Sequence, residues 1–161
     1  MTIGIGYDVH RLKRGRRLFI GGVEFEKAEF GLEGHSDADV LIHAVMDAML
    51  GAAGLRDIEH YFSDKDDKFK GIRSTELLKQ VKEIIGKEGY ELSNVDTILV
   101  AEYPRLAPYI DRIKETLAGI LGVSPGQIGV KATTEEGLGF TGAKEGVAAH
   151  AVALLKEKIN N

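Results

Sequence analysis

The strictest alternation of apolar and polar residues lies at the start of the chain. In residues 3–10, apolar side chains occupy every second position, and glycine or polar residues lie between them. A period of two is typical of a strand, so the pattern predicts a half-buried β-strand. A second apolar run, 18–23, contains Gly21 and Gly22, which predicts a hairpin partner with a bulge or bend. Residues 24–35 are expected to form a mobile loop.

Helical periodicity and capping residues predict the other elements. Ser36 with Asp39 three positions later has the spacing of a capping box, and it predicts a helix that ends near Gly51 or Gly54. Ser74 is expected to cap a helix over 75–87. The remaining expected elements are a strand over 94–101, a helix over 106–121, a strand over 128–133 and a final helix over 145–159. The residues expected on one face of the final helix are Val147, Ala148, Ala151, Val152 and Leu155.

Length and element order predict the fold class. A chain of 161 residues matches one domain, so 1–161 is expected to form a single unit. A hairpin followed by alternating helices and strands predicts an α/β (α+β) fold. We expect a mixed four- to five-stranded sheet with helices packed on one face.

Composition limits the chemistry. The absence of cysteine excludes disulfides and thiolate metal sites, so a transition metal would need His, Asp or Glu ligands, and a cytoplasmic location is expected. A net charge of −4 and the lack of a long apolar segment argue against nucleic-acid binding, a signal peptide or a membrane span. The one basic run, within 11–17, is expected to be a solvated hairpin end, with a phosphate-binding patch as the alternative.

Two elements carry residues suited to a metal ion. Asp8 and His10 share one face of the first strand with two glycines, which predicts a face that is not built to pack. In the next helix, Asp39, His43 and Asp47 recur every fourth residue and therefore share one stripe. The simpler alternatives are a solvent-exposed strand face and a histidine that is only hydrogen-bonded.

Asp8, His10 and His43 together offer one carboxylate and two imidazoles. Three protein ligands with a fourth position open are typical of catalytic zinc. The same ligand set also describes non-haem iron oxygenases, so the spacing alone leaves both possibilities open.

A third group of polar residues lies in 130–142, where a strand is followed by two threonines, two glutamates and three glycines. Backbone N–H groups and side-chain oxygens concentrate at this strand end, which suits a phosphate held with Mg²⁺. A glycine-rich turn with two solvated glutamates is the alternative.

The chain resembles the methylerythritol cyclodiphosphate synthase family in several ordered motifs. The motifs are G-Y-D-V-H (6–10), I-G-G-V (20–23), H-S-D-A-D-V with L-I-H-A (35–44), D-A-M-L-G-A-A (47–53), F-K-G and S-T-E-L-L (69–78), N-V-D (94–96) and K-A-T-T-E-E-G-L-G-F-T-G (131–142). Together they span nearly the whole chain. The chain is too short to include the cytidylyltransferase domain that some relatives carry as a fusion.

The resemblance implies a substrate, two metal sites and an assembly. The substrate would be 4-diphosphocytidyl-2-C-methyl-D-erythritol 2-phosphate, whose 2-phosphate attacks the β-phosphorus of the same molecule and releases CMP. Asp8, His10 and His43 would hold Zn²⁺ or another divalent transition metal, and Glu136 would hold Mg²⁺ or Mn²⁺ with the substrate diphosphate. The family pattern also implies a homotrimer with active sites between subunits.

Further site residues are implied by position in these motifs. The implied catalytic residues are His35, Ser36, Asp47 and Thr134, with His35 and Ser36 in a loop that covers the substrate phosphates. Asp47 would orient a zinc-binding histidine. The implied substrate-binding residues are Asp8, His10, His35, Ser36, Asp57, Asp64, Ala101, Arg105, Leu106, Ala107, Ala132, Thr133, Thr134, Glu136 and Phe140. In this set Asp57 and Asp64 would contact sugar hydroxyls, and 101–107 with 132–133 of a neighbouring subunit would form the cytosine pocket.

The chain departs from the family after G-F-T-G. Many relatives carry arginine there, where three copies meet at the trimer axis and bind isoprenoid diphosphates. Here the position is Ala143, followed by Lys144. Because alanine lacks the planar fork of arginine, we expect weak or no such binding, with Phe140 filling an apolar channel.

Two other activities stay compatible with the residues. A two-metal nucleotide phosphohydrolase would use the same ligands but transfer the phosphoryl group to water. A non-catalytic metal- and nucleotide-binding module would bind CMP without turnover.

Overall fold

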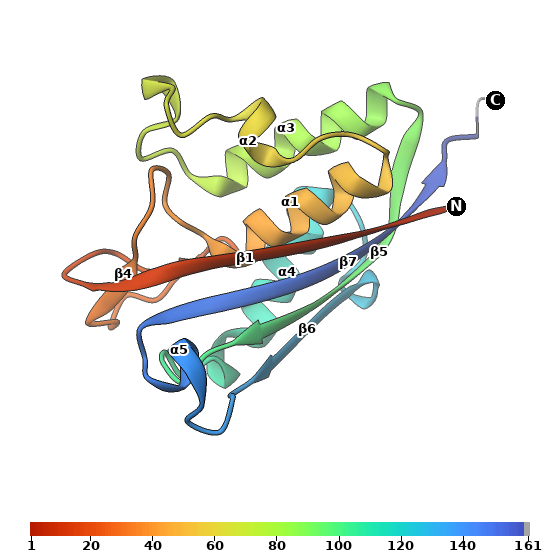
Figure 1. The fold of residues 1–161 in the computed structure, drawn as a ribbon. Coiled ribbons are helices and arrows are strands. Elements are labelled where there is room, and N and C mark those ends of the chain that lie inside the picture. Colours follow the sequence, from red (N-terminus) through yellow and green to blue (C-terminus); the bar gives the residue numbers. More distant parts are fainter. Residues whose placement is uncertain (160–161) are drawn as a thin grey trace.

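A five-stranded mixed sheet with helices on one face forms the body of the protein (Figure 1). The computed structural model describes residues 1–159. The sheet order is β4-β1-β7-β5-β6, in which only the β5–β6 pair is parallel. The strands are β1 (Thr2–Arg14), β4 (Phe30–Leu32), β5 (Tyr90–Val100), β6 (Ile128–Thr133) and β7 (Gly146–Glu157), with a separate hairpin of β2 (Phe19–Ile20) and β3 (Val23–Glu24). The predicted fold class is therefore confirmed.

The helices pack mainly on one side of this sheet. The α-helices are α1 (Val40–Ala52), α2 (Ile58–Tyr61), α3 (Ser74–Lys87), α4 (Ile110–Leu121) and α5 (Gly139–Gly142), and short 3-10 turns occupy Asp67–Phe69, Ala107–Tyr109 and Pro125–Gln127. Helix α1 lies directly over β1 and β7, and α3 and α4 complete the layer (Figure 1). Within the described residues, no helix is long and apolar enough to cross a membrane.

The first strand is present, but its glycine face is the packed one. A Cβ on Gly6 would lie 1.9 Å from the Ala44 carbonyl oxygen, and a Cβ on Gly4 would lie 2.1 Å from that of Ala48. The expectation that the face of glycine, Asp8 and His10 is not built to pack was wrong, because glycine here allows the backbone of α1 to approach the strand. The apolar face is the open one in the single chain, where Ile5 is 74% exposed.

The final helix expected over 145–159 is instead strand β7, the centre of the sheet. Alanine favours a helix locally, but β7 pairs with β1 on one side and β5 on the other, and tertiary pairing outweighs propensity. Its small residues have a packing role, since Ala151 and Ala153 pair with Gly6 and Gly4 beneath α1.

Predictions for three other segments of the first half were wrong in whole or in part. The apolar run 18–23 does not pair with the first strand but folds on itself as β2 and β3, while residues 30–32 of the expected loop pair with β1 as β4. Arg16 of the basic run is not a solvated end residue, because its guanidinium donates to the carbonyl oxygens of Gly34 and Ser36.

Both predicted helix starts differ in detail. The helix after Ser36 begins four residues later, at Val40, with Asp39 as its N-cap: the Asp39 carboxylate accepts from the N–H groups of Ile42, Gly21 and Gly22. Ser74 is the first helical residue of α3 rather than its cap, and its N–H donates to Asp37. Asp39 and Asp37 therefore accept hydrogen bonds from backbone N–H groups in the first turns of α1 and α3.

Candidate metal centre and substrate pocket

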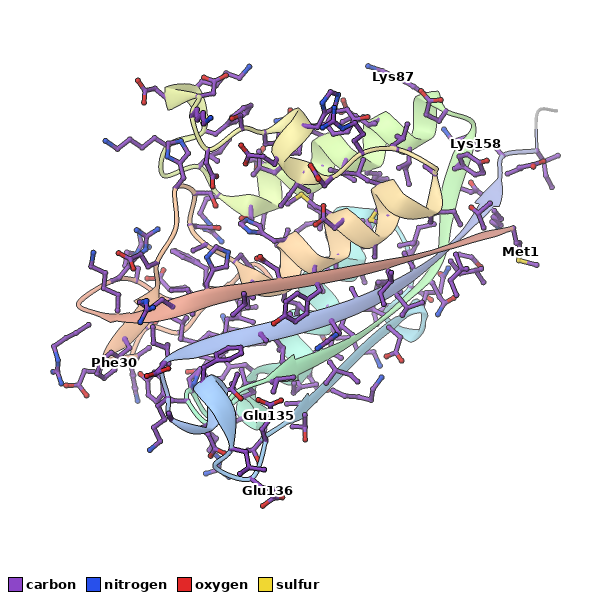
Figure 2. The ribbon with its side chains drawn as sticks, viewed as in Figure 1. Met1, Phe30, Lys87, Glu135, Glu136 and Lys158 are labelled. Carbon is purple, nitrogen blue, oxygen red and sulfur yellow. The ribbon has the colours of Figure 1, made fainter. Side chains whose placement is uncertain are left out.

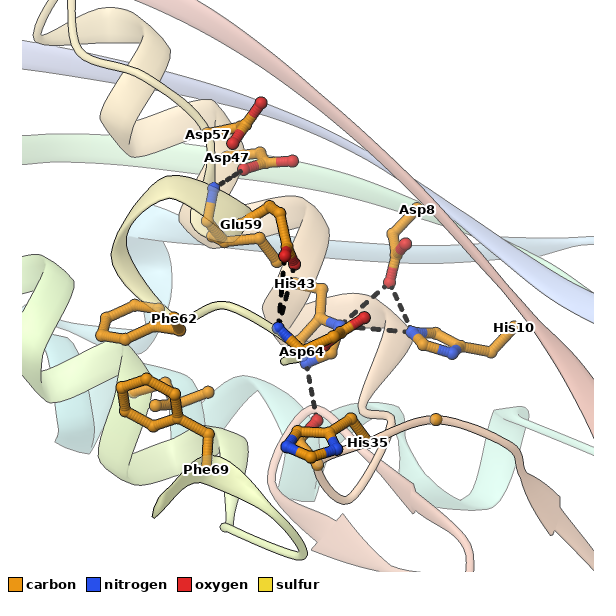
Figure 3. A pocket seen from close by; sticks show the side chains of 14 residues that line it. Asp8, His10, His35, His43, Asp47, Asp57, Glu59, Phe62, Asp64 and Phe69 are labelled. Atoms are coloured by element: carbon orange, nitrogen blue, oxygen red, sulfur yellow. Dashed lines mark hydrogen bonds and ion pairs between the residues drawn. The ribbon is translucent and has the colours of Figure 1, made fainter. Parts of the chain in front are cut away.

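Asp8, His10 and His43 lie together where β1 meets α1, in the arrangement shown in Figure 3. Asp8 Oδ2 is 2.9 Å from His10 Nε2 and 3.1 Å from His43 Nδ1, and the two ring nitrogens are 3.2 Å apart. All three residues can offer one ligand atom within 4.8 Å of the others. The two glycines of β1 make this possible, because they bring the strand close enough to α1 for side chains from both elements to meet.

Each histidine ring is held through the nitrogen that faces away from this cluster. The Nδ1–H of His10 donates to the Glu33 carbonyl oxygen at 2.7 Å, which leaves Nε2 facing Asp8. His43 Nε2 lies 3.0 Å from the Ser74 hydroxyl and 3.3 Å from the Ser36 hydroxyl. His10 Nε2 and His43 Nδ1 therefore converge on the Asp8 carboxylate, as metal ligation requires.

The electrostatics of the cluster favour an ionised carboxylate. Burial opposes the charge on Asp8, but hydrogen bonds from His10 and His43 and their positive charge outweigh it, and the pKa of Asp8 falls to about 2. Burial likewise lowers the pKa of His10, yet the hydrogen bond and charge of Asp8 raise it above its usual value overall. The carboxylate therefore stays ionised, and a bound metal ion could balance its charge in place of a proton on the histidines.

The cluster forms one wall of a cavity of about 320 Å³. Polar residues of the loop 34–36 and of the segment 57–64 line it. Phe62 and Phe69 (Figure 3), together with Leu77, supply an apolar side. The predicted site residues that line this cavity are Asp8, His10, His35, Ser36, His43, Asp47, Asp57 and Asp64. Segments separated by more than fifty residues in sequence thus meet in one pocket.

Asp47 lines the cavity and has its hydrogen-bond partner in α2. Its carboxylate accepts from the Ile58 N–H at 2.9 Å, and between residues 1 and 159 no hydrogen bond joins it to His10 or His43. The structure therefore gives no contact that supports the expected orienting role, which stays a prediction. Burial, followed by the neighbouring Asp57 charge, raises the pKa of Asp47.

The residues predicted for cytosine form a second, separate hollow of about 360 Å³. The predicted residues in its lining are Ala101, Arg105, Leu106, Ala107, Ala132, Thr133 and Thr134. Asp8, Ala149, Leu99 and Ala132 occupy one row across β1, β7, β5 and β6, so Ala132 is three strands, about 14 Å, from Asp8. Ala149 and Leu99, both completely buried, fill the row between the two hollows.

Glu136 and its neighbour differ in their surroundings at the end of β6. Glu135 accepts a hydrogen bond from the buried hydroxyl of Thr141. Glu136 points away from the body of the protein (Figure 2), and its carboxylate has no hydrogen-bond partner among the residues that the structure describes. Phe140 follows in α5 and is 39% exposed. Neither Glu136 nor Phe140 lines the cavity of the metal cluster.

Comparison with known proteins identifies the family. The model of the YgbB family matches residues 1–156. The chain belongs to the YgbB family. A family relative from Clostridium acetobutylicum, named 2-C-methyl-D-erythritol 2,4-cyclodiphosphate synthase, is 52% identical over 155 residues, which cover 96% of this chain and 99% of the relative.

Solved structures of the family share the fold. The bifunctional IspDF of Campylobacter jejuni has a TM-score of 0.93 at 42% identity, and the match covers 98% of this chain but only 42% of that longer protein. An IspF of Plasmodium falciparum, solved as a CDP complex, has a TM-score of 0.85 at 31% identity, with coverage of 98% and 97%. The family assignment therefore holds at the level of sequence and of structure.

Sequence reasoning missed several residues that shape the site. Glu33 holds His10 through its carbonyl oxygen, Arg16 holds the 34–36 loop through two carbonyl oxygens, and Ser74 lies against His43. Asp37 and Ser74 belong to the motifs H-S-D-A-D-V and S-T-E-L-L, so their positions were visible. Their roles were not, since each depends on a contact between distant segments.

Proposed function

We propose that this chain converts 4-diphosphocytidyl-2-C-methyl-D-erythritol 2-phosphate to 2-C-methyl-D-erythritol 2,4-cyclodiphosphate and CMP, in the formation of isoprenoid precursors. The single observation that carries the proposal is the convergence of Asp8, His10 and His43 at the wall of a polar cavity, in a chain of this family. The enzyme class is a lyase acting on phosphorus–oxygen bonds. A cytoplasmic location is part of the proposal.

The donor set fits a divalent metal ion. One ionised carboxylate and two imidazoles are the ligands expected for zinc with an open fourth position, and the depressed pKa of Asp8 keeps its oxygen available. Asp8, His10 and His43 would hold this ion, and Glu136 would hold Mg²⁺ or Mn²⁺ through its carboxylate. When bound, the two ions supply positive charge that stabilises the transferring phosphoryl group.

The residues of the chain position the substrate rather than activate it. A phosphate monoester is already anionic at neutral pH, so its attack on the β-phosphorus needs no general base. His35 and Ser36 would cover the phosphates from the loop that Arg16 holds, with Thr134 approaching from the cytidine side. Asp57 and Asp64 would accept hydrogen bonds from sugar hydroxyls. Because water competes as a nucleophile, the loop must exclude it as well as bind phosphate.

The assembly proposed is a homotrimer in which each site combines two chains. A buried core separates the metal cluster from the 101–107 and 132–134 hollow within one chain, which favours the hollow of a neighbouring copy as the cytosine pocket. The sheet face opposite the helices also needs a partner. It exposes the large apolar residues Ile3, Ile5, Tyr7, Val9, Ile98 and Val152.

The decisive experiment for the reaction is phosphorus NMR on the pure protein with the proposed substrate, Zn²⁺ and Mg²⁺. We expect a cyclic diphosphate with one CMP per turnover. A linear hydrolysis product would support the phosphohydrolase instead, and CMP binding without any product would support the non-catalytic module. As a ligand control, His43→Ala should lose both metal retention and activity while keeping the fold.

The second metal site is tested by two neighbouring variants. Glu136→Gln keeps the shape of the side chain but weakens a hard-cation site, so activity should fall and recover partly at higher Mg²⁺ or Mn²⁺. Glu135→Gln is the matched control, because its carboxylate is already engaged by Thr141. If Glu135→Gln alone showed the metal-dependent rescue, the assignment to Glu136 would be wrong by one residue.

A further inference from the structure

A chain of buried polar groups runs outward from His43 to the start of α3. His43 Nε2 lies 3.0 Å from Ser74 Oγ, and Ser74 Oγ donates to Asp37 Oδ1 at 2.5 Å. Ser74 is completely buried, and His43 and Asp37 are 8% and 7% exposed. Asp37 and His43 belong to the segment at the start of α1, and Ser74 to the distant start of α3, so the contacts of Ser74 exist only in the folded protein.

The proton of Ser74 has one evident acceptor. Asp37 accepts four hydrogen bonds, from the N–H groups of Asp39 and Ser74, from Arg73 Nε and from the Ser74 hydroxyl. A carboxylate surrounded only by donors is itself only an acceptor, and an O–H to O⁻ distance of 2.5 Å is typical of a charge-assisted hydrogen bond. The single hydroxyl proton of Ser74 therefore points at Asp37.

The direction of this proton decides which nitrogen of His43 is bare. Ser74 can offer only lone pairs to His43, so His43 Nε2 must carry a hydrogen and donate it to Ser74 Oγ. A neutral imidazole with hydrogen on Nε2 has its free lone pair on Nδ1. Nδ1 is the atom that faces Asp8 and His10.

We infer that Ser74, oriented by Asp37, is the positioning residue that fixes the tautomer and the ring direction of His43 for metal binding. The inference rests on the metal site in the proposed function and adds the residues that support it. Among the described residues, no hydrogen bond joins Asp47 to His43, and its Oδ1 accepts from the Ile58 N–H instead. Ser36 is the more distant hydroxyl at 3.3 Å, and it already accepts from the Ala38 N–H.

The test measures zinc affinity of the metal-free protein by competition with a chelating indicator. Ser74→Ala removes the acceptor for Nε2–H, and loss of such an outer partner typically weakens metal binding by about 10- to 100-fold. Thr75→Ala is the matched control, because it alters the same turn of α3 but none of the hydrogen-bonded groups of His43, Ser74 and Asp37. We expect it to stay within about twofold of the unaltered protein, well below that loss.

Asp37→Asn gives a second, independent perturbation. Asp37 Oδ2 faces two fixed N–H donors, whereas Oδ1 faces one N–H and the rotatable Ser74 hydroxyl. The new amide group would therefore lie most easily at the Oδ1 position and donate to Ser74 Oγ. The Ser74 proton would then turn toward His43 Nε2 and favour the wrong tautomer, so zinc affinity should fall at least as far as in Ser74→Ala.

A spectroscopic signature distinguishes positioning from a merely structural role. In the zinc-loaded protein, proton NMR should show a slowly exchanging His43 Nε2–H signal, which shifts or disappears in Ser74→Ala. Thermal unfolding identifies a temperature at which every variant is folded. If both folded variants bound zinc like the unaltered protein, the inference would be overturned while the metal site stood. If the unaltered protein did not bind zinc, the metal site itself would be refuted, and this inference with it.

Discussion

The contact between β1 and α1 should tolerate no side chain at Gly6. A Cβ there would lie 1.9 Å from the Ala44 carbonyl oxygen and 2.8 Å from the Ala48 nitrogen, both of which are backbone atoms that cannot rotate away. To reach 3.0 Å, the strand and the helix must separate by about 1 Å. We expect Gly6→Ala to destabilise the fold by about 3 kcal/mol, the upper end of the usual overpacking range.

The same separation should weaken the metal site. Asp8 and His10 move with β1 and His43 moves with α1, and metal sites tolerate errors of only about 0.2 Å in ligand distance. Zinc affinity should therefore fall by more than about tenfold in Gly6→Ala, even at a temperature where the variant is folded. Chemical unfolding of the metal-free protein at one fixed concentration, followed by indicator competition for zinc, measures both effects.

Gly51→Ala, in the helix α1 that packs against Gly6, is the matched control. The nearest atom to a Cβ at Gly51 is the Ile5 carbonyl oxygen at 3.9 Å, an ordinary contact. Alanine has the higher helix propensity, so this variant should gain up to about 1 kcal/mol and keep its zinc affinity. Equal stability of Gly6→Ala and the unaltered protein, or equal damage by both substitutions, would refute the close-packing argument.

Three further expectations concern titration, assembly and the axis of the proposed trimer. Burial and the charge of Asp37 raise the pKa of Asp39 from 3.8 to about 6, so its stabilising contribution is full below pH 3.8 and lost as pH rises through 6. The unfolding free energy relative to Asp39→Asn should therefore fall by on the order of 3 kcal/mol between pH 4 and 7, and a constant difference would contradict the raised pKa. Ile5→Asp should convert the proposed trimer to monomers in light scattering, because it places a charge in the exposed apolar sheet face. An unchanged mass would exclude that face as the interface. Calorimetry should detect no tight binding of geranyl diphosphate, whereas one ligand per three chains that is lost in Lys144→Ala would show that this lysine replaces the missing arginine.

The sequence alone supported the metal ligands because periodicity fixes direction along an element. Residues two apart in a strand share a face, as do residues four apart in a helix, so Asp8 with His10 and His43 with Asp47 could be paired locally. The family motifs then joined the two pairs into one site. The structure brings Asp8, His10 and His43 together as expected, but it gives Asp47 a different partner.

Local patterns failed where two distant segments compete for the same residues. The alternation in β1 showed that the strand has two different faces. It did not show that α1 would pack against the glycine face and leave the isoleucine face exposed. The alanine-rich end was predicted as a helix because propensity is a property of neighbours in sequence, whereas its place between β1 and β5 depends on strands about fifty or more residues away.

The sequence by itself determined the family, several strands and helices such as β1, α1 and α3, and the residue types available for a cation, since these follow from side-chain chemistry and short-range spacing. Only the tertiary structure decided which nitrogen of His43 faces Asp8, which hydroxyl supports the ring, and that the second hollow is walled off from the first. Such features depend on distances between segments that the chain brings together only on folding. Burial then removes water as a hydrogen-bond partner, and a direct hydrogen bond of about 3 Å between protein groups must replace it.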